Sequence, residues 1–497
     1  MSHHFPALLV IAPLLSAFFI SGAGWLNRRF CLPLAVASLG VAGLSALSLF
    51  WRVVQQGPVL YRLGGWDPPW GIAYAVDFLN APVLVLICIV ALLNLWASHR
   101  QVEEQFKEKT GAFYTLYVLM VTGLLGITVT GDAFNLYVLL EIASLSGYGL
   151  IAMGEDRAPL ATLNYVYMGT IGACFYLLGI GYLYIVTGSL NMADIARILP
   201  GLYENKAVLT ALIICLVGLW LKMAFFPLHV WLPNAYTFAP VPSAALIAPL
   251  MTKVMVYVMI RLMLTVFTPG YVFSTLGIND AVVWFAVIAI VMGAILALGQ
   301  RDLKKMISYI IVAEVGYMVG GAWLGNRAGM TGAILHIIND ALMTLCLFLA
   351  VAAITYRMKS YTFSSLKGLI RKMPFTMGAF ILGGLSIIGV PPTCGFFSKW
   401  YLITGALQAG HYGFMAALLF SSLVNVVLFF RIIEIGFFEP FNEGHGHGEH
   451  GPEPMNEAPL SILVPLWIVA LGLVVVGVYT SEIITHVLQF AIPKAIL

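Results

Sequence analysis

The sequence predicts an all-α, polytopic membrane protein with about 14 transmembrane helices. Of its 497 residues, 61% are hydrophobic and only 9% are charged, and the mean hydropathy is +0.95. A soluble domain carries roughly 25% charged residues, so this composition excludes a water-soluble fold. An α-helix needs about 20 apolar residues to cross the bilayer core. Such runs follow one another from Phe5 to near Leu488.

The predicted spans are separated by short polar segments. They lie at residues 5–25, 30–54, 77–97, 111–130, 132–153, 160–185, 207–232, 241–267, 281–299, 305–325, 329–354, 375–404, 411–433 and 460–488. The N-terminal residues lack the positive region of a signal peptide, so we expect the first helix to be retained. Between the second and third spans, Trp66 to Trp70 predict a hairpin at the outer membrane interface, where aromatic side chains gather.

The distribution of Lys and Arg predicts the orientation of the spans, because these residues accumulate on the cytoplasmic side. With the N-terminus outside, fifteen of the 25 fall in inside loops and seven in outside segments. The other three, Lys222, Lys253 and Lys399, lie within spans. We therefore expect both termini to face the outside.

Two predicted spans are interrupted by proline close to a lysine. One interruption comprises the run from Lys222 to Pro227 together with Pro233, and the other comprises Pro391 and Pro392 with Gly395. Proline removes a backbone hydrogen bond and clashes with the preceding helical turn. Non-helical backbone at membrane depth is tolerated only where protein or water surrounds it, and paired broken helices indicate an ion site between internal repeats.

A weak sequence echo also indicates a repeat, since Asp132 precedes Gly147-Tyr148 by 15 residues and Asp302 precedes Gly316-Tyr317 by 14. We predict two inverted repeats with broken helices 7 and 12. The segments are 1–110 (helices 1–3), 111–267 (first repeat, helices 4–8), 281–433 (second repeat, helices 9–13), 434–459 (a cytoplasmic His/Glu-rich loop) and 460–497 (helix 14).

Ionisable side chains well inside the spans are the candidate functional residues. They are Glu141, Lys222, Lys253, Glu314, Asp340 and Lys399, with His336 one turn before Asp340. Each charge at a helix centre costs about 2.5–3.5 kcal/mol on insertion scales, so these groups must face protein, water or each other. A buried lysine whose carboxylate partner comes and goes alternately holds and releases a proton. A purely structural role as a pairing partner explains the presence of Glu314 as well as proton transfer does. For His336 and Asp340, ordinary buried hydrogen bonding is an equally good explanation.

Several other classes of function find no support. The net charge of +3 is spread over many loops, which argues against nucleic-acid binding. The six cysteines stand singly in apolar runs, so neither disulfides nor iron–sulfur ligation is expected. We expect no cofactor and no metal, and flexible or adventitious binding at most for His445, His447 and His450 with Glu449.

The chain resembles a known family, the antiporter-like membrane subunits of respiratory complex I, Mrp cation/proton antiporters and membrane-bound hydrogenases. The similarity is greatest to the Mrp D subunit. It rests on GGWDPPWGIAYAVD from Gly64, GDAFNLYVLLEIASLSGYGLI from Gly131, GLWLKMAFFPLHVWLPNAY from Gly218 and GVPPTCGFFSKW from Gly389. The resemblance implies a multi-pass protein of a prokaryotic inner membrane that works beside other membrane subunits.

The resemblance also implies roles for individual residues. The family's switching pair, a carboxylate in the fifth helix and a lysine in the broken seventh, corresponds to Glu141 and Lys222. The central lysine of the eighth helix corresponds to Lys253, and the terminal lysine of the broken twelfth to Lys399. The implied proton relay runs through these four residues in that order.

This chain departs from the family between the last two lysines. Where relatives commonly have His or Gln before Gly-Tyr, it has Glu314, and HIINDALMT places Asp340 and Thr344 where relatives commonly have His and Lys. We expect Asp340 to hold the His336 imidazole for proton transfer. Alternatively, Glu314 and Asp340 form a site for Na⁺, a hard cation that prefers oxygen ligands.

Three functions follow as hypotheses. The first is an ion-translocating subunit that moves protons by the buried relay, as part of a Na⁺/proton antiporter or of a complex I-like dehydrogenase or hydrogenase. The second is a scaffold that conducts nothing, and the third is an independent carrier of an organic solute. The chain has no redox centre of its own in sequence, so energy must come from partner subunits or an ion gradient.

Overall fold

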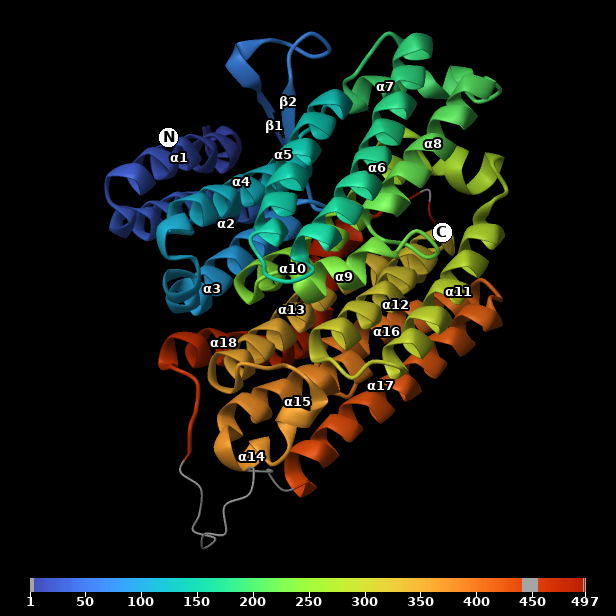
Figure 1. The fold of residues 1–497 in the computed structure, drawn as a ribbon. Helices are drawn as coiled ribbons and strands as arrows, with labels where there is room; N and C mark the ends of the chain where they lie inside the picture. Colours follow the sequence, from blue (N-terminus) through green and yellow to red (C-terminus); the bar gives the residue numbers. More distant parts are fainter. Residues whose placement is uncertain (1–3, 440–454, 495, 497) are drawn as a thin grey trace, which may run out of the picture.

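The computed structural model describes residues 4–439, 455–494 and 496 as a bundle of long helices. Helices run side by side through the whole molecule, and one two-stranded hairpin projects from an end of the bundle (Figure 1). The predicted all-α membrane fold is confirmed. Residues 445–450, with the predicted His/Glu cluster, lie outside the described residues.

The N-terminal part contains three long helices and the hairpin. Its elements are α1 (Phe5–Leu26), α2 (Cys31–Gln56), β1 (Val59–Arg62), β2 (Ala73–Val76) and α3 (Ala81–Phe106). The strands pair antiparallel with Val59 opposite Val76, and the Trp66–Trp70 segment forms the tip between them, as predicted. The hairpin is the only sheet in the described part of the chain.

The first predicted repeat is built from helices α4 to α10. They are α4 (Thr110–Val129), α5 (Ala133–Ala152), α6 (Ala158–Thr187), α7 (Met192–Ile198), α8 (Lys206–Lys222), α9 (Trp231–Phe238) and α10 (Val241–Arg261). A π-helical turn, Leu262–Val266, extends α10.

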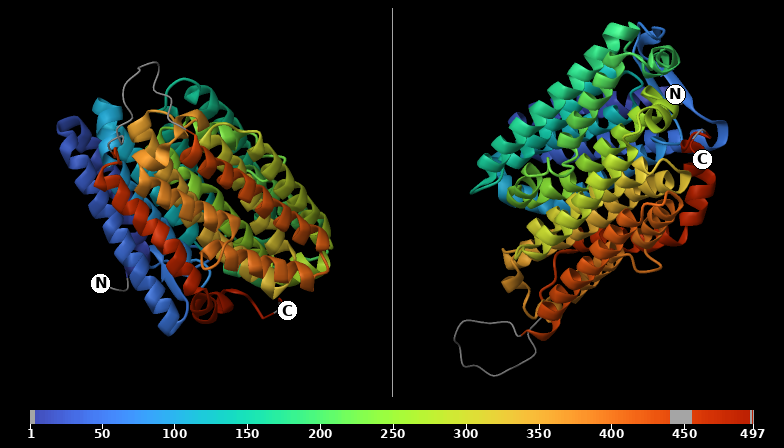
Figure 2. Two further views of the ribbon diagram at one scale, coloured as in Figure 1. Left: turned by 90° about the horizontal axis from the view of Figure 1, so that it is seen from below. Right: turned by 90° about the vertical axis from the view of Figure 1, so that its right-hand side faces the viewer.

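The second predicted repeat and the C-terminal segment follow. They contain α11 (Asn279–Leu298), α12 (Leu303–Trp323), α13 (Arg327–Met358), α14 (Leu369–Lys372), α15 (Pro374–Ile388), α16 (Cys394–Gln408), α17 (Tyr412–Phe438), α18 (Leu460–Val478), α19 (Thr480–Ile483) and α20 (Gln489–Ala491). Helix α18, near the C-terminus, packs against α3 and lies beside the N-terminal helices (Figure 2).

Eleven continuous helical segments of the described chain are long and apolar enough to cross a membrane. One of them, Ala81–Val129, contains both α3 and α4, joined where Lys107 takes a φ of 45°. The two broken spans are not among the eleven, because each of their helical pieces is shorter than 18 residues. The total of fourteen crossings stays a prediction.

Both predicted interruptions are present. Helix α8 ends at Lys222 and α9 begins at Trp231, and α15 ends at Ile388 six residues before α16 begins at Cys394. Two details of the prediction are wrong. Pro233 lies in the first turn of α9, where the missing N–H breaks no helical bond, so it does not interrupt the chain.

The second detail concerns Gly395, which lies inside α16 rather than in the break. A Cβ on this residue would lie 1.9 Å from the Ser386 carbonyl oxygen. The glycine therefore allows α16 to pack directly on the end of α15. The break itself is made by residues 389–393, starting at Gly389 with a φ of 93°.

The weak sequence echo has a structural basis. Asp132 caps α5 by accepting a hydrogen bond from the Asn135 backbone N–H, and Asp302 caps α12 by accepting one from Lys305. Each aspartate also forms an isolated antiparallel bridge, to Asn191 and Thr362 respectively. Burial raises the pKa of both carboxyls. These matching details support the predicted repeats, which remain a proposal.

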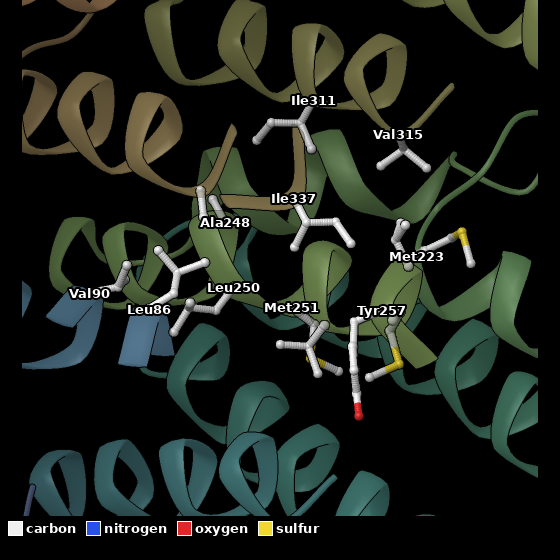
Figure 3. Close-up of a cluster of buried hydrophobic side chains, with 14 of the residues drawn as sticks. Leu86, Val90, Met223, Ala248, Leu250, Met251, Tyr257, Ile311, Val315 and Ile337 are labelled. Atoms are coloured by element: carbon white, nitrogen blue, oxygen red, sulfur yellow. The ribbon is translucent and has the colours of Figure 1, made fainter. Parts of the chain in front are cut away.

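The innermost helices are α10, α12 and α13. Their most apolar 18-residue windows are 100%, 94% and 89% buried, against 33–44% for outer helices such as α1, α17 and α18. Figure 3 shows apolar side chains of α3, α10, α12 and α13 packed together at this centre, among them Leu86, Met251 and Ile337. The predicted functional residues Lys253, Glu314, His336 and Asp340 all lie on these inner helices.

Candidate functional site

Glu141 and Lys222 form an ion pair, as the resemblance implied. Lys222 Nζ lies 3.5 Å from Glu141 Oε1 and donates a shorter hydrogen bond, 2.8 Å, to Ser144 Oγ, one turn away on α5. The lysine is 1% exposed and the glutamate 25%. Lys222 is the last residue of α8, where the helix dipole favours a cation.

Lys253 and Asp340 form a second, fully buried ion pair. Lys253 Nζ on α10 lies 2.9 Å from Asp340 Oδ2 on α13, and neither side chain is more than 1% exposed. The ammonium also donates to Thr344 Oγ1 at 3.3 Å and to the Ala248 carbonyl at 3.2 Å. Thr344 in turn donates to Asp340 Oδ1 at 2.9 Å. Asp340 and Thr344, two departures from the family pattern, thus hold one lysine together.

The expected contact between Asp340 and His336 is wrong. His336 Nε2 pairs with Glu314 Oε2 across from α12, and His336 Nδ1 lies 2.8 Å from Ser398 Oγ on α16. The spacing of four residues puts His336 and Asp340 on one face of α13, but different neighbouring helices meet that face at each turn. Glu314 is therefore the acid that binds the imidazole, and Asp340 forms an ion pair with Lys253 instead.

Lys399 completes the row at the second broken helix. Its Nζ donates to the carbonyls of Ile387 at 2.6 Å and Ile388 at 3.4 Å, the last two residues of α15. It also donates to Ser422 Oγ at 3.2 Å and lies 5.1 Å from the centre of the Tyr317 ring. In both broken spans the ammonium group of a buried lysine thus lies near the C-terminal end of the first half-helix, although Lys222 belongs to that half-helix and Lys399 to the second.

Three buried tyrosines, which sequence reasoning missed, lie between the first two ion pairs. The Tyr148 ring contacts Tyr165, Tyr165 stacks on Trp231 at 3.9 Å between centroids, and Trp231 contacts Tyr236. Tyr148 interacts electrostatically with Glu141 at one end of this series, and Tyr236 with Asp340 at the other. In the described structure, none of the three hydroxyls has a hydrogen-bond partner.

Unpaired hydroxyls of this kind are unusual in a protein interior, where polar groups bind protein or ordered water. The tyrosine series therefore provides polar positions between Lys222 and Lys253 that suit water molecules. A phenol within an apolar run carries no sequence signal that separates it from an ordinary core residue.

A second missed residue is Lys304, which sequence reasoning assigned to an inside loop. It is 1% exposed and donates at 2.7 Å to the Ala239 carbonyl, just after the C-terminal end of α9. A pocket of about 510 Å³ opens above it and is lined by the carboxylates of Glu104, Glu155 and Asp156. Positive charge at a helix C-terminus and acids at the mouth make this a candidate entrance for cations or protons.

Arg261, the last residue of α10, forms a bidentate ion pair with Asp77, at 2.6 and 2.8 Å. Arg261 also donates to the Tyr257 hydroxyl at 3.0 Å. Burial alone would raise the pKa of Asp77, but the guanidinium and the backbone N–H groups of Asn80 and Leu79 outweigh it and hold this pKa below its usual value. The pair fixes the hairpin and the start of α3 to the central helix.

Among the described residues, no group of three or more His, Cys, Asp or Glu side chains is arranged to hold a metal ion. Glu314 and Asp340 do not share a site, since each faces a nitrogen of the protein. The structure thus brings the seven predicted residues into three pairs and Lys399, and we call these seven residues the row.

Comparisons with known proteins agree with this architecture. Residues 130–425 match the family model described as NADH:quinone oxidoreductase/Mrp antiporter, TM. The chain is 42% identical to NADH-quinone oxidoreductase subunit N of Desulforudis audaxviator, over 99% of both chains. It is 30% identical to the D subunit of the Na(+)/H(+) antiporter of Alkalihalophilus pseudofirmus, over 97% of this chain and 96% of that protein.

Two solved structures share the fold. A chain of the membrane-bound sulfane sulfur reductase, an archaeal respiratory membrane complex, superposes with a TM-score of 0.89 at 28% identity, over 97% of this chain and 96% of that one. A chain of the Mrp complex from Dietzia sp. DQ12-45-1b superposes with a TM-score of 0.87 at 23% identity, over 99% and 98%.

Proposed function

Since this chain belongs to the membrane family of NADH:quinone oxidoreductase and Mrp antiporter subunits, we propose that it moves protons through its buried ion pairs. It is a polytopic membrane subunit, and its relatives are parts of multisubunit membrane complexes. Other membrane subunits are therefore its partners. The proposed route runs Glu141, Lys222, Lys253, His336 with Glu314, and Lys399.

One observation carries the proposal: six of the seven ionisable groups are buried, Glu141 is partly exposed, and each of the seven has a polar partner within hydrogen-bonding distance. An isolated lysine at a helix centre costs about 2.5–3.5 kcal/mol, and an ion pair with no further role adds little stability in the interior. Two of the three buried lysines are held by a carboxylate and a hydroxyl, and the third, Lys399, is held by two carbonyls and a hydroxyl. Such an arrangement is better explained by transport than by packing.

The two ion pairs differ in a way that suits switching. Glu141 is partly exposed and lies 3.5 Å from Lys222, whereas Asp340 is fully buried and lies 2.9 Å from Lys253. A buried lysine holds its proton less firmly once its carboxylate partner moves away. We infer that the looser Glu141 pair opens first, and that the proton then passes to Lys253 along water held by Tyr148, Tyr165 and Tyr236.

The geometry favours protons over Na⁺ as the ion that crosses the second half of the row. Na⁺ needs several oxygen ligands at one point, as other hard cations do. Glu314 and Asp340, the two carboxylates available, are each engaged by His336 or Lys253. The remaining contacts of the row are between lysine or imidazole nitrogens and hydroxyls, which pass protons.

Two complexes remain candidates for the assembly. An antiporter complex, in which proton flow drives Na⁺ export, is favoured by the match to the antiporter relative. A redox-driven proton pump is favoured by the higher identity to the oxidoreductase relative. Purifying the complex and identifying its subunits separates the two, since only a redox pump contains flavin or iron–sulfur subunits.

We place the protein in the prokaryotic cell membrane with both termini outside, because this orientation gives the asymmetry of Lys and Arg between the loops. The acidic pocket over Lys304 then opens on the cytoplasmic side, and the Asp77–Arg261 pair lies on the outer side.

A double-mutant cycle on the first pair tests the proposal. Glu141→Ala and Lys222→Ala should each reduce proton transport by about 10²-fold or more per assembled complex, the usual size of a lost proton-transfer group. The double variant should be little worse than either, as expected of residues that act as one unit.

The matched control cycle uses Asp194→Ala and Arg197→Ala, which remove an ion pair of 2.7 Å on α7 outside the row. Such exposed pairs contribute about 0.2–1 kcal/mol to stability and should leave transport unchanged. Near-normal transport in Glu141→Ala would overturn the relay, and loss of assembly in both relay variants without loss of flux per complex would favour the scaffold.

A further inference from the structure

A polar pocket of about 340 Å³ lies at the turn between α1 and α2, and none of the ion-paired residues lines it. Its walls come from that turn and from the adjoining ends of α3 and α4, and they include Arg28, Arg29, Glu103 and Tyr114, with Leu32 and Pro33 on the apolar side. Nothing in the proposed relay uses these residues.

Two neighbouring arginines supply positive charge to the pocket. Arg28 and Arg29 are exposed residues of a short 3₁₀ turn, Arg28–Phe30, and neither makes an ion pair within the described structure. Guanidinium groups bind phosphate oxygens with paired, charge-assisted hydrogen bonds. Two unpaired guanidiniums at one pocket therefore favour a phosphate group.

A buried donor points to a ligand independently of the charge. Tyr114 lines the pocket, is 1% exposed, and its hydroxyl has no hydrogen-bond partner among the described residues. A buried hydroxyl that has lost its water without gaining a hydrogen bond is unfavourable. A phosphate oxygen in the pocket would accept this hydrogen bond.

Glu103 narrows the chemistry of the ligand. Its carboxylate also lines the pocket and would repel a purely anionic group. A headgroup that carries an ammonium besides its phosphate satisfies both the arginines and the glutamate. Phosphoethanolamine has this charge pattern, whereas phosphoglycerol does not.

The position of the pocket identifies its source as the membrane. Helix α1 has 22 residues, which is enough to cross the hydrocarbon core, and it ends at Leu26 beside the pocket. Trp25 and Leu26 are 93% and 91% exposed, and Phe30 is 60% exposed, as expected of side chains inserted in the bilayer interface. Leu32 and Pro33 lie where the first carbons of the acyl chains would pass.

We propose that this pocket binds the headgroup of a phospholipid with an amine, such as phosphatidylethanolamine. Arg28, Arg29 and the Tyr114 hydroxyl hold its phosphate, and Glu103 holds its ammonium. The inference depends on the membrane location of the chain and not on the proton relay, so each can fail without the other.

Native mass spectrometry of the purified, delipidated complex tests this site, with phosphatidylethanolamine or phosphatidylglycerol added back. The Arg28→Gln/Arg29→Gln variant should bind phosphatidylethanolamine at least about tenfold more weakly, as expected for lost charge-assisted hydrogen bonds. The matched control is Lys107→Gln/Lys109→Gln, which removes two cations near the same end of α3 that do not line the pocket. Its lipid binding should be unchanged.

Two further variants separate headgroup recognition from general charge. Glu103→Gln should abolish the preference for phosphatidylethanolamine over phosphatidylglycerol while keeping both bound. Tyr114→Phe should weaken binding by about two- to tenfold without lowering thermal stability, because it removes an unpaired hydroxyl.

Equal lipid binding in the arginine variant and its control would overturn the proposal. So would binding of soluble phosphoethanolamine as tight as that of the lipid, which would assign the site to a free anion. If a segment of another protein fills the pocket in the intact complex, no lipid is retained there, and the proposal fails.

Discussion

The buried pair of Lys253 and Asp340 yields the sharpest prediction, which uses the substitution Asp340→Asn. Lys253 Nζ lies 2.9 Å from Asp340 Oδ2, and both side chains are almost fully buried. The amide oxygen of asparagine can still accept the hydrogen bond that Thr344 donates to Oδ1, so the packing of α13 should be kept. What is lost is the negative charge facing the ammonium.

The size of the effect follows from the burial of the pair. Removing one partner of a buried ion pair costs about 3–5 kcal/mol while the other stays charged. At 1.36 kcal/mol per factor of ten, this cost corresponds to a factor of about 10²–10⁴ in an equilibrium constant. We therefore expect proton translocation per assembled complex to fall by about two orders of magnitude or more.

The assay is proton flux in everted membrane vesicles, divided by the amount of assembled complex. The control is Asp77→Asn, which removes a carboxylate from a half-buried ion pair that lies outside the proposed route. It should destabilise the chain but keep the flux per complex. Flux within a few-fold of wild type in Asp340→Asn would refute the reasoning, and a change in Na⁺ affinity alone would instead support a cation site.

The remaining predictions concern the tyrosine series, the outer ion pair and the topology. Tyr236→Phe should reduce proton flux by about two- to tenfold, the equivalent of one hydrogen bond, whereas the control Tyr176→Phe, whose hydroxyl donates to the Ala133 carbonyl at 3.1 Å, should lower thermal stability and leave flux per complex unchanged. Equal flux in both would remove the tyrosines from the route. Because Arg261 holds the pKa of Asp77 below its usual value, the stability that this pair contributes should be present at neutral pH and be lost as the pH falls below about 4, through the lowered pKa. Thermal unfolding followed against pH should show this acid loss in wild type and not in Asp77→Asn, and identical profiles would contradict it. Impermeant labels at Met1 and after Leu497 should react from outside and a label at His447 from inside, and a cytoplasmic C-terminus would show that the spans are miscounted.

Much of the fold could be predicted because a membrane chain obeys strong constraints. Apolar runs of about 20 residues must be helices, since the bilayer offers no other partner for backbone groups. The two broken helices were equally predictable, because Pro227 and Pro391 remove hydrogen bonds in the middle of such runs. The seven candidate residues stood out because charge inside a span is rare.

The pairing of those residues could not be predicted. Spacing along α13 places His336 and Asp340 on one face, but it does not reveal that Glu314 of α12 meets one and Lys253 of α10 meets the other. Contacts between helices depend on packing over the whole bundle. The expected Asp340–His336 contact failed for this reason.

Other functional residues were missed because their local sequence is ordinary. Lys304 follows the helix cap Asp302 by two residues, among other cationic residues, so the distribution of Lys and Arg assigned it to a cytoplasmic loop. In the structure it is buried against the end of α9. Tyr148, Tyr165 and Tyr236 look like apolar core residues until their hydroxyls are found without partners. Only three-dimensional accounting of hydrogen bonds identifies such positions.

Proton flux through the assembled complex carrying Lys253→Met tests the central claim most directly. Lys253 is the middle member of the proposed route, and methionine fills a similar volume without a titratable group. With assembly verified by the yield of intact complex, the account predicts flux below about 1% of wild type. Flux above half of the wild-type value would show that protons do not pass through this row of residues.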